Sequence, residues 1–110
     1  MRILSSEKTH RNGQRELKQL LTADIKQINV YEATRGAILG NHSHNYKEYF
    51  YITKGTFMVR IADNSFAANP GFIFRVDPNE KHTLEALTNK ASFMTFLTEA
   101  YDPKQPDAYK

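Results

Sequence analysis

The stretch GAILGNHSHNYKEYFYITKG, residues 36–55, contains two histidines and a glutamate within seven residues. His42, His44 and Glu48 have the same parity, so in an extended strand their side chains project from one face of a sheet. Tyr46 shares that parity. Imidazole nitrogens and a carboxylate oxygen are ligands that suit a borderline divalent metal. The stretch therefore predicts a metal site on a strand, and the alternative is a histidine pair in a solvated loop with Glu48 on a wet strand face.

Glu48 has an unusual setting in the strand that this alternation predicts over residues 46–53. Phe50 and Ile52 share its face, whereas residues of the other parity form the opposite face. An ionised carboxylate beside apolar side chains is costly unless it is paired or binds a cation. The pattern therefore favours a functional role for Glu48. Further along the chain, His82 is able to supply one more nitrogen.

The length of 110 residues suits one domain with a single hydrophobic core, which we expect to span residues 1–110. The 40% hydrophobic and 25% charged residues are ordinary for a soluble globular protein. No apolar run approaches the length of a membrane span and the N-terminus lacks a signal-peptide core, so we expect a cytoplasmic protein without membrane contact. Because the chain has no cysteine, any metal site must rest on His, Asp or Glu.

The net charge of +3 and the pI of about 9.2 raise the question of nucleic acid binding. A nucleic-acid-binding surface usually has clustered Lys and Arg, often interleaved with aromatic residues. Here the basic residues are spread along the chain, and the densest run, residues 11–18, also contains Glu16. We therefore expect no nucleic acid partner, while the charge still allows a site for an anionic small molecule.

Short alternating segments separated by turn signals continue from Asp24 to Thr98. In residues 27–32, Ile28 and Val30 alternate with polar neighbours and predict a strand with one apolar face. Many short strands with frequent turns are typical of an all-β sandwich or barrel. The turn signals are Arg35-Gly36, Lys54-Gly55, Asp63-Asn64-Ser65, Asn69-Pro70-Gly71 and Asp77-Pro78-Asn79-Glu80.

The two ends of the chain have weaker patterns. Within residues 1–22, Arg11-Asn12-Gly13 is a turn signal. Leu17, Leu20 and Leu21 fit either a helix or a short edge strand. Residues 99–110 contain two prolines and several charges, which indicates a tail that lies over the surface or is partly mobile.

The spacing of these residues resembles the two sequence motifs of the cupin superfamily, whose fold is a small jelly-roll β-barrel. The first motif is G, five residues, H-x-H, three or four residues, E, six residues, G, and residues 36–55 match it without departure. The second is G, five residues, P-x-G, two residues, H, three residues, N, and residues 71–86 match it in part. Asp77 replaces the proline, Ala86 the asparagine and Asn79 the glycine, although Asn79 still suits a turn position that glycine fills. The resemblance implies an all-β, cupin-type jelly-roll β-barrel with its motif region at 36–82.

By this resemblance His42, His44, Glu48 and His82 would be the four ligands of one divalent transition metal. The sequence does not choose among Fe, Mn, Ni, Cu, Co and Zn. Open coordination positions would let the metal act as a Lewis acid or bind oxygen, so the chain would be an isomerase or a dioxygenase acting on a small molecule. A dioxygenase would need an apolar pocket lined by side chains such as Phe50. Small cupins commonly pair through an N-terminal strand, which implies a homodimer that involves residues 1–22.

The run from Asp24 to His44 is also similar to small cupins that act on nucleotide-linked sugars, among them sugar-nucleotide epimerases and 3,4-ketoisomerases. Several of these use no metal: a histidine removes a proton next to a ketone and a tyrosine can return it. His42 or His44 would then be the base, with Tyr46 or Tyr49 as the proton donor. All four metal ligands are nevertheless present, which a metal-free isomerase would not need. The arginines that could meet a diphosphate are Arg35, Arg60 and Arg75, although scattered arginines and tyrosines are usually surface or core residues.

Three classes of function therefore remain open from the sequence. The first is a metal-dependent cupin enzyme, and the second is a metal-free sugar-nucleotide epimerase or ketoisomerase with a histidine base. The third is a non-catalytic module that binds or senses a small molecule. The metal content of the purified protein separates the first class from the second.

Overall fold

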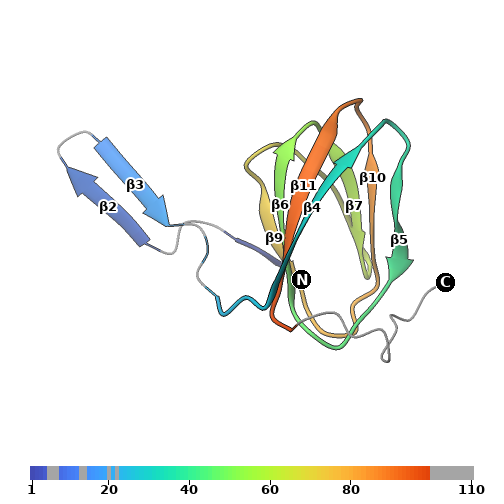
Figure 1. Cartoon of the computed structure of the whole chain (residues 1–110), viewed down its shortest axis with the longest axis horizontal. Helices are drawn as coiled ribbons and strands as arrows, with labels where there is room; N and C mark the ends of the chain where they lie inside the picture. The colour runs from blue at the N-terminus through green and yellow to red at the C-terminus, as the bar shows by residue number, and fades with distance from the viewer. Residues whose placement is uncertain (5–7, 13–14, 20, 22, 100–110) are drawn as a thin grey trace.

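All regular structure in the described residues is β-strand (Figure 1). The computed structural model describes residues 1–4, 8–12, 15–19, 21 and 23–99. None of these residues belongs to a helix that could cross a membrane. The expected all-β fold is therefore confirmed. The strands are β1 (Arg2–Ile3), β2 (Lys8–Asn12), β3 (Arg15–Gln19), β4 (Gln27–Ala33), β5 (Ile38–His42), β6 (Glu48–Lys54), β7 (Phe57–Ile61), β8 (Asn64–Ala68), β9 (Ile73–Val76), β10 (His82–Ala86) and β11 (Ala91–Leu97).

Two antiparallel sheets face each other and enclose the hydrophobic core. The larger sheet has the strand order β1-β9-β6-β11-β4, and the smaller has the order β5-β10-β7-β8. Consecutive strands mostly belong to opposite sheets, as in a jelly roll, so the connections cross the ends of the sandwich. Among the described residues no ladder joins one sheet to the other, and the barrel is therefore not closed. The core contains Phe50, Ile52, Phe74 and Phe93 from the larger sheet and Phe57, Val59, Ile61 and Leu84 from the smaller.

The turn between β6 and β7 requires a glycine. Gly55 has a φ of +69°, and a Cβ placed there would lie 2.8 Å from Ala91 Cβ and 2.9 Å from Ala91 Cα. Residues with a side chain rarely adopt this φ, and the space is already filled. The turn predicted at Asp63-Asn64-Ser65 begins earlier, since β8 starts at Asn64 and Ala62 has a φ of +50°. The other predicted turns connect strands as expected, at Arg35-Gly36, Lys54-Gly55, Asn69-Pro70-Gly71 and Asp77-Pro78-Asn79-Glu80.

Strand β4 presents its apolar face to solvent. The apolar face of an alternating strand normally packs on the core, yet Ile28 is 56% exposed and Val30 is 69% exposed. The inward positions are polar or aromatic instead: Asn29 Nδ2 donates to Thr95 Oγ1 at 3.1 Å, whereas Tyr31 stacks on an inward phenylalanine of β11. The alternation predicted the strand correctly. Only the packing of the larger sheet against the smaller one shows which face of β4 is inside.

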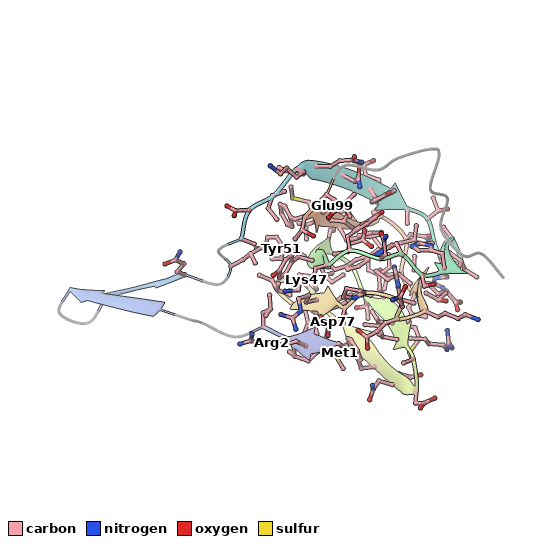
Figure 2. The ribbon with its side chains drawn as sticks, turned by 90° about the horizontal axis from the view of Figure 1, so that it is seen from below. Met1, Arg2, Lys47, Tyr51, Asp77 and Glu99 are labelled. Carbon is pink, nitrogen blue, oxygen red and sulfur yellow. The ribbon has the colours of Figure 1, made fainter. Side chains whose placement is uncertain are left out.

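Strands β2 and β3 form a separate two-stranded antiparallel hairpin, so residues 15–19 are strand rather than helix. In Figures 1 and 2 this hairpin stands away from the two sheets. Residues 13 and 14 of the predicted turn and Leu20 lie outside the described residues, as does the segment 100–110. The chain returns to the sandwich at β4.

Candidate functional site

The four predicted ligands come from four places in the fold. His42 is the last residue of β5, Glu48 is the first residue of β6, and His44 lies in the connection between them. Because β5 and β6 belong to opposite sheets, the expectation that one strand carries all three residues is wrong. The chain instead crosses the end of the sandwich between His42 and Glu48. His82 opens β10, which pairs with β5.

A β-bulge aims His42 inward. His82 and Leu84 of β10 are two residues apart, but their partners on β5, His42 and Leu39, are three residues apart. The extra residue reverses the alternation of side chains at that point. As a result Leu39 packs against the core and His42 is also buried. His42 then lies directly opposite His82, with ring centroids 4.3 Å apart.

The four side chains form a compact, buried cluster. One potential ligand atom from each of His42, His44, Glu48 and His82 lies within 4.8 Å of the other three. None of the four residues is more than 8% exposed. His44 Nε2 lies 2.8 Å and His82 Nε2 lies 3.3 Å from the same Glu48 oxygen, Oε1. The residues that the sequence singled out therefore meet at one point.

Two of the imidazoles have their orientation and tautomer fixed by the backbone. His44 Nδ1 lies 3.1 Å from the carbonyl oxygen of Tyr46, and His82 Nδ1 lies 2.9 Å from that of Glu80. A carbonyl oxygen can only accept, so each Nδ1 must carry the hydrogen. In the neutral ring each Nε2 then presents a lone pair toward Glu48. His82 Nε2 is buried and makes no hydrogen bond of acceptable geometry.

This arrangement calls for a cation. Two nitrogen lone pairs that face one carboxylate oxygen repel it, unless a proton or a metal ion lies among them. Burial alone would raise the pKa of Glu48, but the hydrogen bond with His44, the contact with His82 and the positive charge of these rings when protonated lower that pKa from 4.5 to about 2. Glu48 is therefore ionised at neutral pH. Three imidazoles and one carboxylate form a donor set that fits a divalent transition metal.

The turn from Asp77 to Glu80 supports two of the histidines. Asn79 N–H donates to the carbonyl oxygen of His44 at 2.6 Å, and the Glu80 carbonyl accepts from His82. Asn79 has a φ of +66°, which confirms that it suits a position that glycine fills in the family motif. This turn therefore links the two segments that carry His44 and His82.

Side-chain contacts in turn hold this support in place. Glu80 Oε1 accepts from the Asp77 N–H at 2.7 Å, and Asp77 Oδ1 accepts from Arg75 Nε at 2.6 Å. The Met1 ammonium group contacts both carboxylates, and Figure 2 shows Met1 beside Asp77. Burial opposes these pairs, but hydrogen bonds from the ammonium group and from Arg75 lower the pKa of Asp77. Asp77, which replaces the proline of the family motif, is thus part of a local ionic network.

Two of the other predicted site residues contact the cluster. The Tyr46 ring stacks on His44, with centroids 4.1 Å apart and planes 1° apart. Phe50 is completely buried and meets His82 edge-on at 5.7 Å. Tyr46 therefore orients a histidine, and Phe50 forms the apolar wall beside the cluster.

The remaining predicted residues lie elsewhere. Tyr49 and Arg75 are paired across β6 and β9 on the outer face of the larger sheet. Arg60 lies on the outer face of the smaller sheet, 3.8 Å from Glu85. Arg35 is in the exposed turn that precedes β5, whereas His42 ends that strand. The structure therefore does not bring Tyr49 or the three arginines to the cluster.

The sequence interpretation missed a row of polar residues on the inner face of the larger sheet. Gln27 is paired with Leu97, and Leu97 is paired with Glu48, so Gln27 lies two strands away from the cluster. Gln27 Nε2 donates to Asn29 Oδ1 at 3.0 Å, and Asn29 donates to the buried Thr95. These amides are suited to bind substrate hydroxyl or phosphate groups. The alternation of polar residues at 27 and 29 was the available signal.

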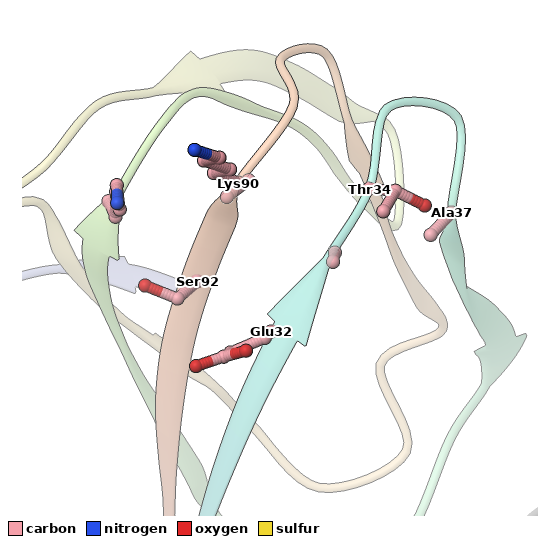
Figure 3. A pocket seen from close by; sticks show the side chains of 8 residues that line it. Glu32, Thr34, Ala37, Lys90 and Ser92 are labelled. Atoms are coloured by element: carbon pink, nitrogen blue, oxygen red, sulfur yellow. The ribbon is translucent and has the colours of Figure 1, made fainter.

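Two surface pockets in the described part of the chain lie away from the cluster. The first has a volume of about 600 Å³ at the end of β4 and the start of β11, and Figure 3 shows Glu32, Lys90 and Ser92 along it. The second has a volume of about 510 Å³ on the outer face of the smaller sheet, around Arg60 and Lys81. Neither includes a residue of the cluster.

Residues 30–98 match the family model of the cupin domain, and the chain belongs to that family. No curated protein is similar enough in sequence to count as a match. The fold is similar to that of the rmlC epimerase of Mycobacterium tuberculosis, with 15% identity and a TM-score of 0.76, over 96% of this chain and 66% of the epimerase.

Two further solved structures share this fold. ChmJ, a 3'-monoepimerase from Streptomyces bikiniensis in complex with dTDP-quinovose, has 13% identity and a TM-score of 0.77, over 96% of this chain and 67% of ChmJ. A 3,4-ketoisomerase from Helicobacter canadensis has 15% identity and a TM-score of 0.73, over 93% of this chain and 86% of the isomerase. The chain thus spans about two thirds of the length of the two epimerases, and the likeness at these identities is one of fold.

Proposed function

We propose that this chain is a metal-dependent cupin isomerase whose substrate is a small carbohydrate of the nucleotide-linked class. His42, His44, Glu48 and His82 would hold one divalent transition metal. When bound, the metal supplies Lewis-acid polarisation of a substrate carbonyl group. The cluster supports the metal, and the fold shared with sugar epimerases and a ketoisomerase supports the substrate class by analogy.

The observation that carries this proposal is the direction of the donor atoms. His44 and His82 each donate from Nδ1 to a backbone carbonyl and present Nε2 to Glu48 Oε1. A metal ion held by these residues would satisfy both nitrogens and the carboxylate together. Apolar core packing accounts for none of these orientations.

The other side chains near the cluster have supporting roles in the proposal. Phe50 excludes water from one side of the cluster, and Tyr46 holds the plane of the His44 ring. The Tyr46 hydroxyl is also the candidate proton donor, since Tyr49 lies on the outer face of its sheet. The amides of Gln27 and Asn29 would orient substrate hydroxyl or phosphate groups.

A metal-free epimerase is the second candidate, because the same fold-level likeness supports it. In that case His42 would be the base that removes a proton next to a ketone. His44 and His82 are poor candidates because both of their ring nitrogens are already directed to a backbone carbonyl and to Glu48.

The test measures the metal content of protein purified without chelators or nickel affinity resin. We expect about one divalent metal per chain in the wild type, and less than about a tenth of that in Glu48→Gln, because the amide is a poor ligand. Glu85→Gln is the matched control, since Glu85 lies outside the cluster beside Arg60. Incubation of a nucleotide-linked keto sugar in D2O, followed by proton NMR, reports deuterium exchange next to the ketone.

The outcomes separate the candidates. The metal-dependent isomerase is supported if the wild type and Glu85→Gln both bind metal and exchange deuterium, while Glu48→Gln does neither. A wild type that takes up no metal after incubation with Zn²⁺, Mn²⁺ or Co²⁺, yet exchanges deuterium, supports the metal-free epimerase. Bound metal without exchange of any keto sugar tested contradicts both enzyme proposals.

A further inference from the structure

The surface pocket of about 600 Å³ is lined by charged groups that are not engaged in ion pairs. Its volume is typical of sites that bind small molecules. Figure 3 shows Glu32, Ser92 and Lys90 around it, and Lys54 also lines it. In the described part of the chain, neither Glu32 nor Lys54 nor Lys90 forms an ion pair. The pocket can therefore offer two ammonium groups and one carboxylate to a ligand.

The strand register separates these charges. Glu32 on β4 and Lys54 on β6 are both Cα partners of Ser92, one on each side of β11. Because neighbouring strands are about 4.8 Å apart, the backbone positions of the carboxylate and the ammonium group are roughly 10 Å apart. The hydroxyl of Ser92, which is hydrogen-bonded to Thr53 Oγ1 at 2.7 Å, lies on the strand between them. The pocket thus has a negative side at β4, a positive side at β6 and a hydroxyl group in the middle.

Hydrogen bonds between three turns hold the backbone around the pocket. The N–H of Arg35 donates to Asn89 Oδ1 at 3.2 Å, which joins the turn before β5 to the turn before β11. The N–H of Thr56 donates to Thr88 Oγ1 at 3.1 Å, which joins the turn after β6 to the same turn before β11. Since the backbone is held in place before a ligand arrives, binding has to order little more than the lysine side chains.

Lys90 has an unfavourable backbone conformation. Its φ of +56° lies in the left-handed region, which glycine and asparagine adopt more readily than lysine. Residues held in such conformations are concentrated at functional sites. A lysine in this conformation at the edge of the pocket therefore supports a binding role for its ammonium group.

The pocket and the histidine cluster lie at opposite ends of the sandwich. Strand β6 begins with Glu48 in the cluster and ends with Lys54 at the pocket. The strand rises about 3.3 Å per residue, so these two residues are roughly 20 Å apart. In Figure 1, β4 and β6 point to the upper end of the sandwich, whereas β5, which ends at His42, points to the lower end. A ligand of the pocket would therefore not touch the cluster.

We propose that this pocket binds an acidic amino acid, which carries two carboxylates and one ammonium group. The charges of such a ligand are the reverse of those of the pocket. Lys54 and Lys90, which lie on different turns, each meet one carboxylate, and Glu32 accepts from the ammonium group of the ligand. A ligand with negative groups alone would leave Glu32 facing like charges, which disfavours it. The proposal does not depend on the proposed isomerase activity.

Titration of the ¹⁵N-labelled protein with L-glutamate, followed by ¹H–¹⁵N NMR spectra in a low-salt Tris buffer, measures the affinity and locates the site. We expect chemical-shift changes at Glu32, Lys90 and Ser92, with a dissociation constant of about 1 mM because the three charged side chains are exposed. Glutarate lacks the ammonium group and L-glutamine lacks the second carboxylate. Each should bind roughly three- to fivefold more weakly than L-glutamate.

Substitutions in the pocket test the role of each charge. Lys90→Asn removes an ammonium group, and asparagine tolerates the φ of +56°, so the affinity for L-glutamate should fall roughly three- to fivefold in a folded protein. Lys26→Asn is the matched control, because Lys26 is exposed just before β4, at the other end of that strand. This control should bind L-glutamate as the wild type does. Glu32→Gln should lose the preference for L-glutamate over glutarate.

Several results would overturn the proposal. Chemical-shift changes confined to the histidine cluster would place L-glutamate elsewhere, and no change at about 20 mM L-glutamate would exclude the expected affinity. Equal affinities of the wild type for L-glutamate and glutarate would remove the role of Glu32, and a Lys90→Asn variant with wild-type affinity would remove that of Lys90. Tighter binding of O-phosphoethanolamine than of L-glutamate would show that the pocket selects a phosphate ester instead.

Discussion

Replacement of Glu48 by glutamine tests the electrostatics of the cluster without a change in side-chain size. In the metal-free protein the ionised carboxylate faces the Nε2 atoms of His44 and His82, at 2.8 Å and 3.3 Å, and a proton among these atoms takes the place of the metal ion. Glutamine keeps the shape but removes the charge. We expect Glu48→Gln to destabilise the metal-free protein at pH 7.

The pKa of Glu48 sets the magnitude. Burial opposes ionisation, but the hydrogen bonds and charges of His44 and His82 lower the pKa from 4.5 to about 2. Each pKa unit corresponds to about 1.4 kcal/mol, so the ionised form contributes about 3 kcal/mol to the free energy of unfolding at pH 7. Because the folded-state pKa is the lower one, this contribution is complete above pH 4.5 and is lost as the pH falls toward 2.

Urea denaturation in the presence of EDTA measures the difference. Glu48→Gln should be about 3 kcal/mol less stable than the wild type at pH 7, and the gap should narrow as the pH falls below 4.5. Glu85→Gln is the control, because its partly exposed carboxylate lies 3.8 Å from Arg60 and such pairs contribute about 0–1 kcal/mol. Added Zn²⁺ should stabilise the wild type and Glu85→Gln but not Glu48→Gln.

Equal stability of metal-free Glu48→Gln and wild type at pH 7 would refute this reasoning. It would mean that the two imidazoles do not stabilise the carboxylate in the absence of metal. A difference in stability between Glu48→Gln and the wild type that stays constant from pH 7 to pH 2 would also refute it. The loss of stability would then be unrelated to the ionisation of Glu48.

Four further substitutions, in two pairs, test the turns. Gly55→Ala should lower the free energy of unfolding, measured by urea denaturation, by about 2–4 kcal/mol, because a φ of +69° is combined with contacts below 3 Å. Gly36→Ala, with a φ of +87° and open space, should lower it by only about 1–2 kcal/mol. Equal losses of stability in the two variants would contradict the steric argument. Asn79→Val should weaken Zn²⁺ binding in a chelator competition assay roughly tenfold or more, because a β-branched residue disfavours the φ of +66° and displaces the N–H that holds His44. Asn79→Gly should bind Zn²⁺ as the wild type does, and weakened binding there would assign the effect to the lost amide side chain.

The sequence by itself determined the all-β class, several of the strands, most turns and three of the four residues of the cluster. Alternation with period two defines a strand locally, and glycine or asparagine at positions of positive φ defines a turn. These preferences act within a few residues, so a single segment such as residues 36–55 shows its own strands and turns without the rest of the chain. The resemblance to the cupin motifs added His82, which the structure brings to within 4.8 Å of the other three ligand atoms.

The tertiary structure decided what depends on the partner of each strand. The strand signal did not show that the chain changes sheets between His42 and Glu48, or that a bulge turns His42 inward. It also predicted an apolar face at Ile28 and Val30 without showing that this face is outside. Alternation separates the two faces of a strand, but which face is buried depends on the opposite sheet.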